Sequence, residues 1–229
     1  KKPAAARRRG SPWPLRIAAI VGTRPQLIKL AALRPHLTAP IEPFVVDTAQ
    51  HHDELLAGQI YRDLGMAPPD LLLPGPGDLR DAARLDAMVR ELDVALVQTR
   101  PDVVLVFGDT DSTLAGALAA PDHGVPIIHV EAGVRSGDLT MPEERNRIAV
   151  DAIAALRLCT SDTAIAALEL EGRGDGNEVV GDLMADLVAR LAPAARSLAA
   201  LEQVGARIGR SLVSGGYVFA TLHRADVRE

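Results

Sequence analysis

The stretch PDVVLVFGDTDSTLAGALAA, residues 101–120, shows the pattern that decides the fold. A continuous apolar run at residues 103–107 leads into the polar turn Gly108-Asp109-Thr110-Asp111, and a helical stretch rich in small residues follows at 112–120. Strands that are apolar throughout, without a period of two, are typical of parallel sheets covered on both faces. The stretch therefore predicts one strand–turn–helix unit of an α/β fold.

The same rhythm repeats on both sides of this unit. Further strands are predicted at residues 15–21, 44–46, 127–130 and 156–159, with a last one at 179–181. Helices are predicted at residues 25–37, 79–97, 112–120 and 163–170. This alternation predicts a doubly wound parallel α/β sheet, a Rossmann-like domain, over residues 15–185.

The flanking segments have different compositions. Residues 1–14 are basic and proline-rich, which predicts a disordered tail, and the apolar run after them is too short for a signal peptide. Residues 186–214 are rich in alanine and leucine and predict a helical connector, interrupted at Pro193. A strand-like run at 217–222 then predicts that residues 215–229 open a second Rossmann-like domain, incomplete in this chain.

Composition excludes several classes of protein. With a net charge of −5 and 3% aromatic residues, the 229-residue chain is unsuited to binding nucleic acid. The single cysteine, Cys159, excludes an intramolecular disulfide and a multi-cysteine metal site, and its apolar strand predicts a packing role. No apolar run reaches the roughly 20 residues of a membrane span. We expect a cytoplasmic protein without a nucleic-acid or membrane partner.

The turn after the first strand, GTRPQLIK at residues 22–29, favours anion binding. It combines a helix N-terminus with Arg24 and Lys29, which suits a phosphate or diphosphate, although an ordinary turn with surface basic residues would look similar. The glycine patterns of phosphate loops and of dinucleotide-binding turns are absent. We therefore expect no bound NAD.

Carboxylates follow several of the predicted strands: Asp109, Glu131, and Glu143 or Glu144. The carboxyl ends of parallel strands are where ligands bind in such sheets, and buried carboxylates are costly unless they are paired or functional. Two interpretations stay open, general acid–base chemistry and an ion-pair network. The arginines available for such a network are Arg135, Arg145 and Arg147. Asp109 and Asp111 could hold a metal, but helix capping accounts for them more simply, and no metal is expected.

Taken together, six motifs resemble the UDP-N-acetylglucosamine 2-epimerase family. They are GTRPQLIK (22–29), TAQHHDELL (48–56), residues 101–120, PIIHVEAGVRSGD (126–138), PEERNR (142–147) and TLHR (221–224). The resemblance implies the N-terminal half of a two-domain fold like that of GT-B glycosyltransferases, with the substrate in the interdomain cleft. It also implies a homodimer that interconverts UDP-GlcNAc and UDP-ManNAc without a cofactor, for cell-surface polysaccharide biosynthesis.

The resemblance also assigns roles to residues. Asp109, Glu131, Glu143, His223 and Lys29 match catalytic positions, and Arg135 is expected to orient the carboxylates. The positions that match UDP or substrate contacts are Arg24, Gln50, His51, Arg135 and Arg224. Because closure of two domains holds UDP beside the reaction intermediate, the present chain alone is expected to be inactive.

Three positions depart from the family pattern. Asp53 stands where a second glutamine is expected, Gly77 where an arginine is expected, and residues 223–229 lack the usual asparagine after His-Arg. These departures count against an allosteric site for a second UDP-GlcNAc. They leave open a hydrolysing epimerase that releases ManNAc and UDP. Two functions outside epimerisation also stay open, a GT-B glycosyltransferase and a non-catalytic nucleotide-sugar-binding module.

Overall fold

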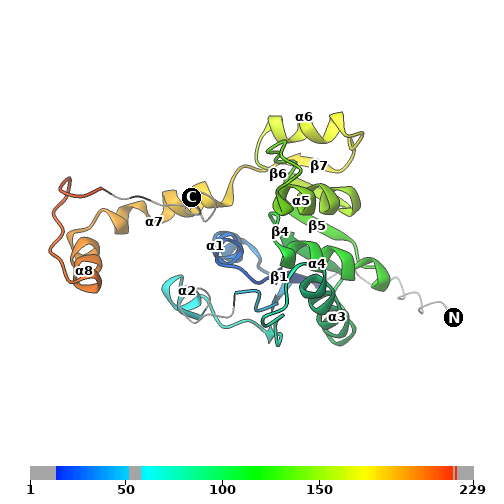
Figure 1. The fold of residues 1–229 in the computed structure, drawn as a ribbon, viewed down its shortest axis with the longest axis horizontal. Helices are drawn as coiled ribbons and strands as arrows, with labels where there is room; N and C mark the ends of the chain where they lie inside the picture. The colour runs from blue at the N-terminus through cyan, green and yellow to red at the C-terminus, as the bar shows by residue number, and fades with distance from the viewer. Residues whose placement is uncertain (1–13, 52–57, 219, 221–229) are drawn as a thin grey trace. The chain divides into compact units, whose positions relative to one another are not determined.

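The computed structural model describes residues 14–51, 58–218 and 220, and the chain divides into two compact units, Lys1–Met184 and Ala185–Glu229. The described part of the first unit contains one seven-stranded sheet in the order β3-β2-β1-β4-β5-β6-β7, with every pair parallel (Figure 1). The strands are β1 (Leu15–Val21), β2 (Ile41–Asp47), β3 (Leu71–Leu72), β4 (Val103–Phe107), β5 (Ile127–Ala132), β6 (Leu156–Cys159) and β7 (Asn177–Val179). The predicted doubly wound parallel sheet is confirmed.

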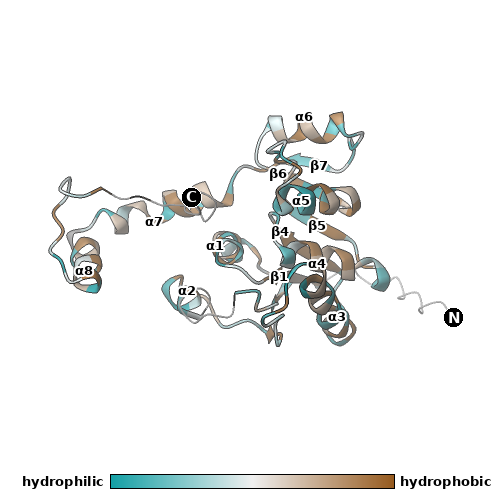
Figure 2. Ribbon diagram, viewed as in Figure 1, coloured by the Kyte–Doolittle hydropathy of each residue, from teal (hydrophilic) through white to brown (hydrophobic). Residues whose placement is uncertain are grey.

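Helices cover both faces of this sheet, and each face has its own apolar core. Along β1, Ala18 and Ile20 enter one core, whereas Ile17, Ala19 and Val21 enter the other. The helices of the first core are α3 (Asp81–Thr99), α4 (Asp111–Ala119) and α5 (Pro142–Ile153), and those of the second are α1 (Arg24–Leu33) and α2 (Gly58–Asp63). Helix α4 lies between α3 and α5 and is apolar over most of its length (Figure 2). Burial on both faces is the reason that the central strand β4 is apolar throughout.

Helix α5 is the largest element that sequence patterning missed. Its first half, PEERNR, is charged enough to hide the helical periodicity of its buried residues. Pro142 at the first helical position and Glu143 and Glu144 in the first turn favour a helix start there, because they suit the unpaired N–H groups and the positive end of the helix dipole. The short elements α2 and β3 were also not predicted. Strand β7 ends at Val179, two residues before the end of the predicted strand.

The second unit is helical. Helix α7 (Leu183–Ala195) contains Pro193, so the predicted interruption at that residue is wrong. The break falls at Arg196 and Ser197, and the Ser197 side chain accepts a hydrogen bond from the Ala200 N–H to begin α8 (Leu198–Ile208). Of the strand expected at residues 217–222, the described residues 217, 218 and 220 are not in a strand, and the other three lie outside the described residues. In the described ranges no helix combines the length and hydrophobicity needed to cross a bilayer.

Gly133, just after β5, is required by a close backbone contact. Its φ is 75°, and a Cβ there would lie 2.4 Å from the backbone oxygen of Ala164, in α6 (Asp162–Leu170). Gly65 has a similar φ of 63°, but nothing lies within 4 Å of its Cβ position. We expect Gly133→Ala to lower the free energy of unfolding by about 2 kcal/mol or more and Gly65→Ala by about 1 kcal/mol, measured by urea denaturation. Equal losses would contradict the close packing of α6.

Candidate active site

Two carboxylates meet at the carboxyl ends of neighbouring strands. Asp109 follows β4 by two residues, and Glu131 is the penultimate residue of β5, where the strand register shifts between Val130 and Ala132. Glu131 has a φ of 65°, which is uncommon for a residue with a side chain. This local distortion lies where β4 and β5 carry their polar residues to one edge of the sheet, as the sequence predicted.

Arg147 of α5 joins the two carboxylates. Its Nη2 lies 2.5 Å from Asp109 Oδ2 and 3.1 Å from Glu131 Oε1, and its Nη1 donates to the Glu131 backbone carbonyl. From the opposite side, Lys29 Nζ in α1 lies 2.5 Å from Glu131 Oε2. Glu131 therefore lies between two cations, and Asp109 shares one of them.

The surroundings of Glu131 decide its charge. Burial raises the pKa of Glu131, but the neighbouring Lys29 and Arg147 outweigh burial and hold that pKa below its ordinary value. The carboxylate is therefore ionised at neutral pH. An ionised carboxylate that is 21% exposed and held by fixed cations can accept a proton from a bound molecule.

The turn that carries Asp109 is fixed from α5 and α3. Asn146 Nδ2 donates to the Asp109 backbone carbonyl at 3.0 Å and to Asp111 Oδ1 at 3.3 Å. Arg84 Nη2 lies 2.7 Å from Asp111 Oδ2. Asp111 thus has an arginine and an amide as partners. Within the part of the chain that the structure describes, no group of three or more His, Cys, Asp or Glu side chains could hold a metal ion.

The segment after β2 lies against the start of α4. Gln50 Oε1 accepts hydrogen bonds from the Ser112 backbone N–H at 2.9 Å and from Ser112 Oγ at 2.6 Å. The His51 backbone N–H donates to the Gly22 carbonyl at 2.7 Å. These bonds attach the predicted substrate-binding residues Gln50 and His51 to the turns after β1 and β4.

Other predicted residues lie apart from this cluster. Arg24 is the exposed first residue of α1, and its side chain makes no hydrogen bond or ion pair within the described residues. Glu143 is likewise exposed and, among the described residues, unpaired, so it is not brought into contact with Asp109 or Glu131. The neighbouring Glu144 is buried and accepts hydrogen bonds from the N–H groups of Ser136 and Gly137. His223 and Arg224 lie outside the described residues.

Arg135 does not orient the two carboxylates, which corrects the sequence-based expectation. Its guanidinium lies 2.8 Å from Asp151 and 2.7 Å from Glu171 instead. Among the described residues, Arg145 donates only to the backbone carbonyls of Leu139 and Thr140. Arg147 is the one of the three candidate arginines that reaches the site, because it lies on the buried face of α5.

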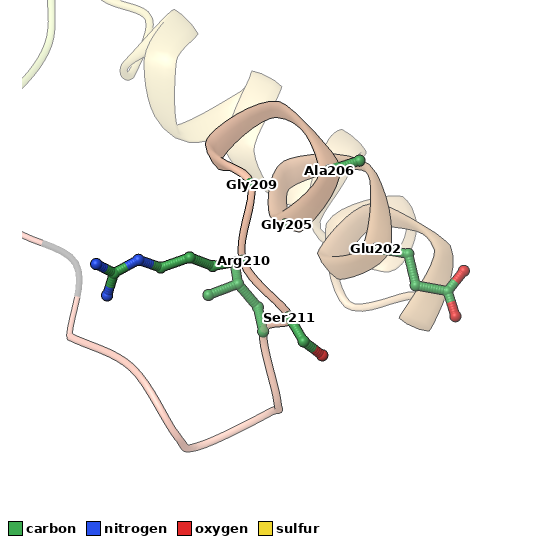
Figure 3. A pocket seen from close by; sticks show the side chains of 7 residues that line it. Glu202, Gly205, Ala206, Gly209, Arg210 and Ser211 are labelled. Carbon is green, nitrogen blue, oxygen red and sulfur yellow. The ribbon is translucent and has the colours of Figure 1, made fainter.

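The second unit has a hollow of its own. It is lined by Glu202, Gly205, Ala206, Gly209, Arg210, Ser211 and Leu212 (Figure 3). The charged ends of Glu202 and Arg210 point away from each other (Figure 3), and none of the predicted site residues lines the hollow. The hollow therefore brings none of the predicted site residues together.

Comparison with known proteins gives a consistent result. The family model for UDP-N-acetylglucosamine 2-epimerase matches residues 36–229. A "UDP-N-acetylglucosamine 2-epimerase homolog" of Methanococcus maripaludis is 35% identical over 93% of the chain, and a UDP-2,3-diacetamido-2,3-dideoxy-D-glucuronate 2-epimerase of Pseudomonas aeruginosa is 36% identical over 93%. The chain spans 58% of the length of each of these two relatives.

Solved structures agree with this result. The crystal structure of the Methanocaldococcus jannaschii UDP-GlcNAc 2-epimerase in complex with UDP-GlcNAc and UDP superposes with a TM-score of 0.80 at 31% identity. The match covers 85% of this chain and 54% of that one. The motifs, the fold and the family model thus lead to one conclusion: the chain belongs to the UDP-N-acetylglucosamine 2-epimerase family.

Proposed function

We propose that the protein interconverts UDP-GlcNAc and UDP-ManNAc by inverting C2 of the sugar. The observation that carries the proposal is the pair Asp109 and Glu131, which share Arg147 Nη2 at 2.5 and 3.1 Å beside Lys29. Family membership supports this reaction. So does the name of the Methanocaldococcus jannaschii relative, whose structure contains UDP-GlcNAc and UDP.

The chemistry explains why carboxylates and cations are needed together. The C2 hydrogen of an acetamido sugar is too weakly acidic for direct removal. When the C1–O bond breaks and its electron pair leaves with UDP, positive charge at C1 acidifies that hydrogen. A carboxylate then takes the C2 proton, and 2-acetamidoglucal and UDP remain. Return of UDP to C1 and of a proton to the opposite face of C2 gives the epimer.

Each described residue has a defined role in this proposal. Glu131 and Asp109 exchange protons with C2 from positions fixed by Arg147, and Lys29 stabilises negative charge on Glu131 and on the departing diphosphate. Arg24, exposed at the start of α1, is available to the diphosphate. Further acid–base and UDP contacts are proposed for Glu143, His223, Gln50, His51, Arg135 and Arg224.

The proposal extends to the assembly. The relatives are longer than this chain, which supports a second Rossmann-like domain that closes over the sugar and excludes water. We place the active enzyme in the cytoplasm, as a homodimer, with a UDP-sugar as its substrate and no cofactor. Its product would serve the synthesis of cell-surface polysaccharide.

Incubation of the full-length protein with UDP-GlcNAc in D₂O tests this proposal. Because the C2 proton passes through an exchangeable carboxylate, we expect UDP-ManNAc with deuterium at C2, detected by proton NMR and mass spectrometry. Free ManNAc with UDP would identify the hydrolysing form. A parallel incubation with UDP-2,3-diacetamido-2,3-dideoxy-D-glucuronate addresses the substrate named for the Pseudomonas aeruginosa relative. Absence of C2 exchange with both sugars would overturn the proposal and favour a glycosyltransferase or a binding module.

A further inference from the structure

His129, on β5, is completely buried, and its ring lies between two oxygen atoms. Its Nε2 lies 2.7 Å from the backbone oxygen of Gly108, and its Nδ1 lies 2.7 Å from Asp151 Oδ1. The Gly108 carbonyl can only accept a hydrogen bond, so Nε2 carries a hydrogen. The other ring nitrogen, Nδ1, faces the carboxyl group of Asp151.

Asp151, on α5, is held as a carboxylate. Its Oδ2 accepts a hydrogen bond from the Gly133 N–H at 3.1 Å and lies 2.8 Å from the guanidinium of Arg135. Burial raises the pKa of Asp151, but His129 and Arg135 outweigh it and lower the pKa below its ordinary value. Both ring nitrogens of His129 thus face oxygen acceptors. The ring and the carboxylate form a completely buried pair.

This buried pair holds the backbone on both sides of the candidate active site. Through Gly108 it holds the residue that precedes Asp109, and through Gly133 it holds the residue two positions after Glu131. Gly108, Glu131 and Gly133 all have positive φ values, of 67°, 65° and 75°. Such conformations persist where surrounding contacts enforce them.

We propose that the His129–Asp151 pair positions Asp109 and Glu131 for proton transfer at C2. This inference rests on the proposed epimerase function. The pair does not contact the two carboxylates, and its action is through the backbone turns that carry them. The rate of proton transfer depends steeply on the distance and angle between the carboxylate and C2. A small shift in either turn therefore lowers turnover without removing a substrate contact.

Two substitutions separate the two hydrogen bonds. The amide nitrogen of asparagine can take the place of Nδ1, so His129→Asn keeps a donor to Asp151 and loses the donor to Gly108. The amide nitrogen of glutamine can take the place of Nε2, so His129→Gln keeps the donor to Gly108 and loses the one to Asp151. The matched control is His123→Asn. His123 Nε2 lies 3.1 Å from Asp93, so the two residues form a second histidine–aspartate pair, and this pair is remote from the site residues in the fold.

The variants are compared as full-length proteins by kcat and KM for UDP-GlcNAc, with folded protein quantified by UDP binding. We expect both His129 variants to lose about tenfold or more in kcat per folded molecule, with KM within about twofold of wild type. His123→Asn should match wild type in both constants. Wild-type kcat in either His129 variant, even with a lowered melting temperature, would overturn the proposal and leave the pair a purely structural one.

Two further measurements do not depend on the activity of a variant. If the His129 variants do not fold, ¹⁵N NMR of the wild-type ring decides: an Nε2–H hydrogen-bonded to the Gly108 carbonyl supports the positioning inference, and an Nε2 without a hydrogen overturns it. If the wild type shows no epimerisation, the proposed function fails by itself. The positioning inference is then decided by amide hydrogen exchange at Gly133, which should be faster in His129→Gln and unchanged in His123→Asn; unchanged exchange in both would overturn it.

Discussion

Replacing Glu131 by glutamine in the full-length protein is expected to lower turnover by about 10²-fold or more, the usual range for loss of a general acid or base. Glutamine keeps the size of the side chain but cannot take up a proton from C2. The affinity for UDP should change little, because Glu131 is engaged by Lys29 and Arg147 rather than by a binding surface for the nucleotide. Steady-state kinetics, with C2 deuterium incorporation as a second readout, measures the loss.

The ion-pair interpretation predicts a different result for the same variant. If Glu131 serves only to neutralise Lys29 and Arg147, Glu131→Gln lowers the free energy of unfolding while the folded molecules keep nearly full activity. Asp109→Asn offers the same comparison for the second carboxylate. Glu178→Gln, an exposed change on β7, is the control and should retain wild-type kcat and stability. Full activity in both Glu131→Gln and Asp109→Asn would refute their catalytic roles.

Replacing Arg147 by methionine is expected to lower the free energy of unfolding at pH 7 by about 3 kcal/mol, at the lower end of the range for breaking a buried ion pair. Arg147 is 5% exposed, and its removal leaves Asp109 and Glu131 adjacent without the guanidinium that joins them. The estimate is at the lower end because the Asp109 side chain is still 31% exposed to solvent. Urea denaturation gives the value.

The loss of unfolding free energy in Arg147→Met should also depend on pH. In the wild type the lowered pKa of Glu131 contributes stability that is present above the unfolded-state pKa and is lost as pH falls through the folded-state pKa. Without Arg147 that pKa moves back up, so the difference between variant and wild type is largest near neutral pH and shrinks in acid. Arg145→Met is the control on the same helix, since Arg145 is exposed and, in the part of the chain that the structure describes, donates only to two loop carbonyls. A loss for Arg147→Met that equals the control, or that stays constant with pH, would contradict the cluster geometry.

The sheet was predictable because the residue types within each central strand already indicate that the strand is buried. The run Val103–Phe107 and residues 17–21 are apolar throughout because both faces of the sheet are covered, and each run is local in sequence. Helix α5 and strand β3 were missed for local reasons as well. The charged PEERNR half of α5 obscures helical periodicity, and β3 is two residues long.

The sequence by itself determined that Asp109 and Glu131 lie at one edge of the sheet, since parallel strands bring their carboxyl ends together. Only the tertiary structure decided which cations meet them. Arg135, Arg145 and Arg147 have the same chemistry and lie close together in sequence, so their partners depend on how α5 is rotated about its axis and on the path of the loop before it. The same rotation buries Glu144 and exposes Glu143, and it brings Asp151 against His129. Such contacts join residues on different elements, and their formation depends on the packing of α5 against the sheet, which no local pattern of residues specifies.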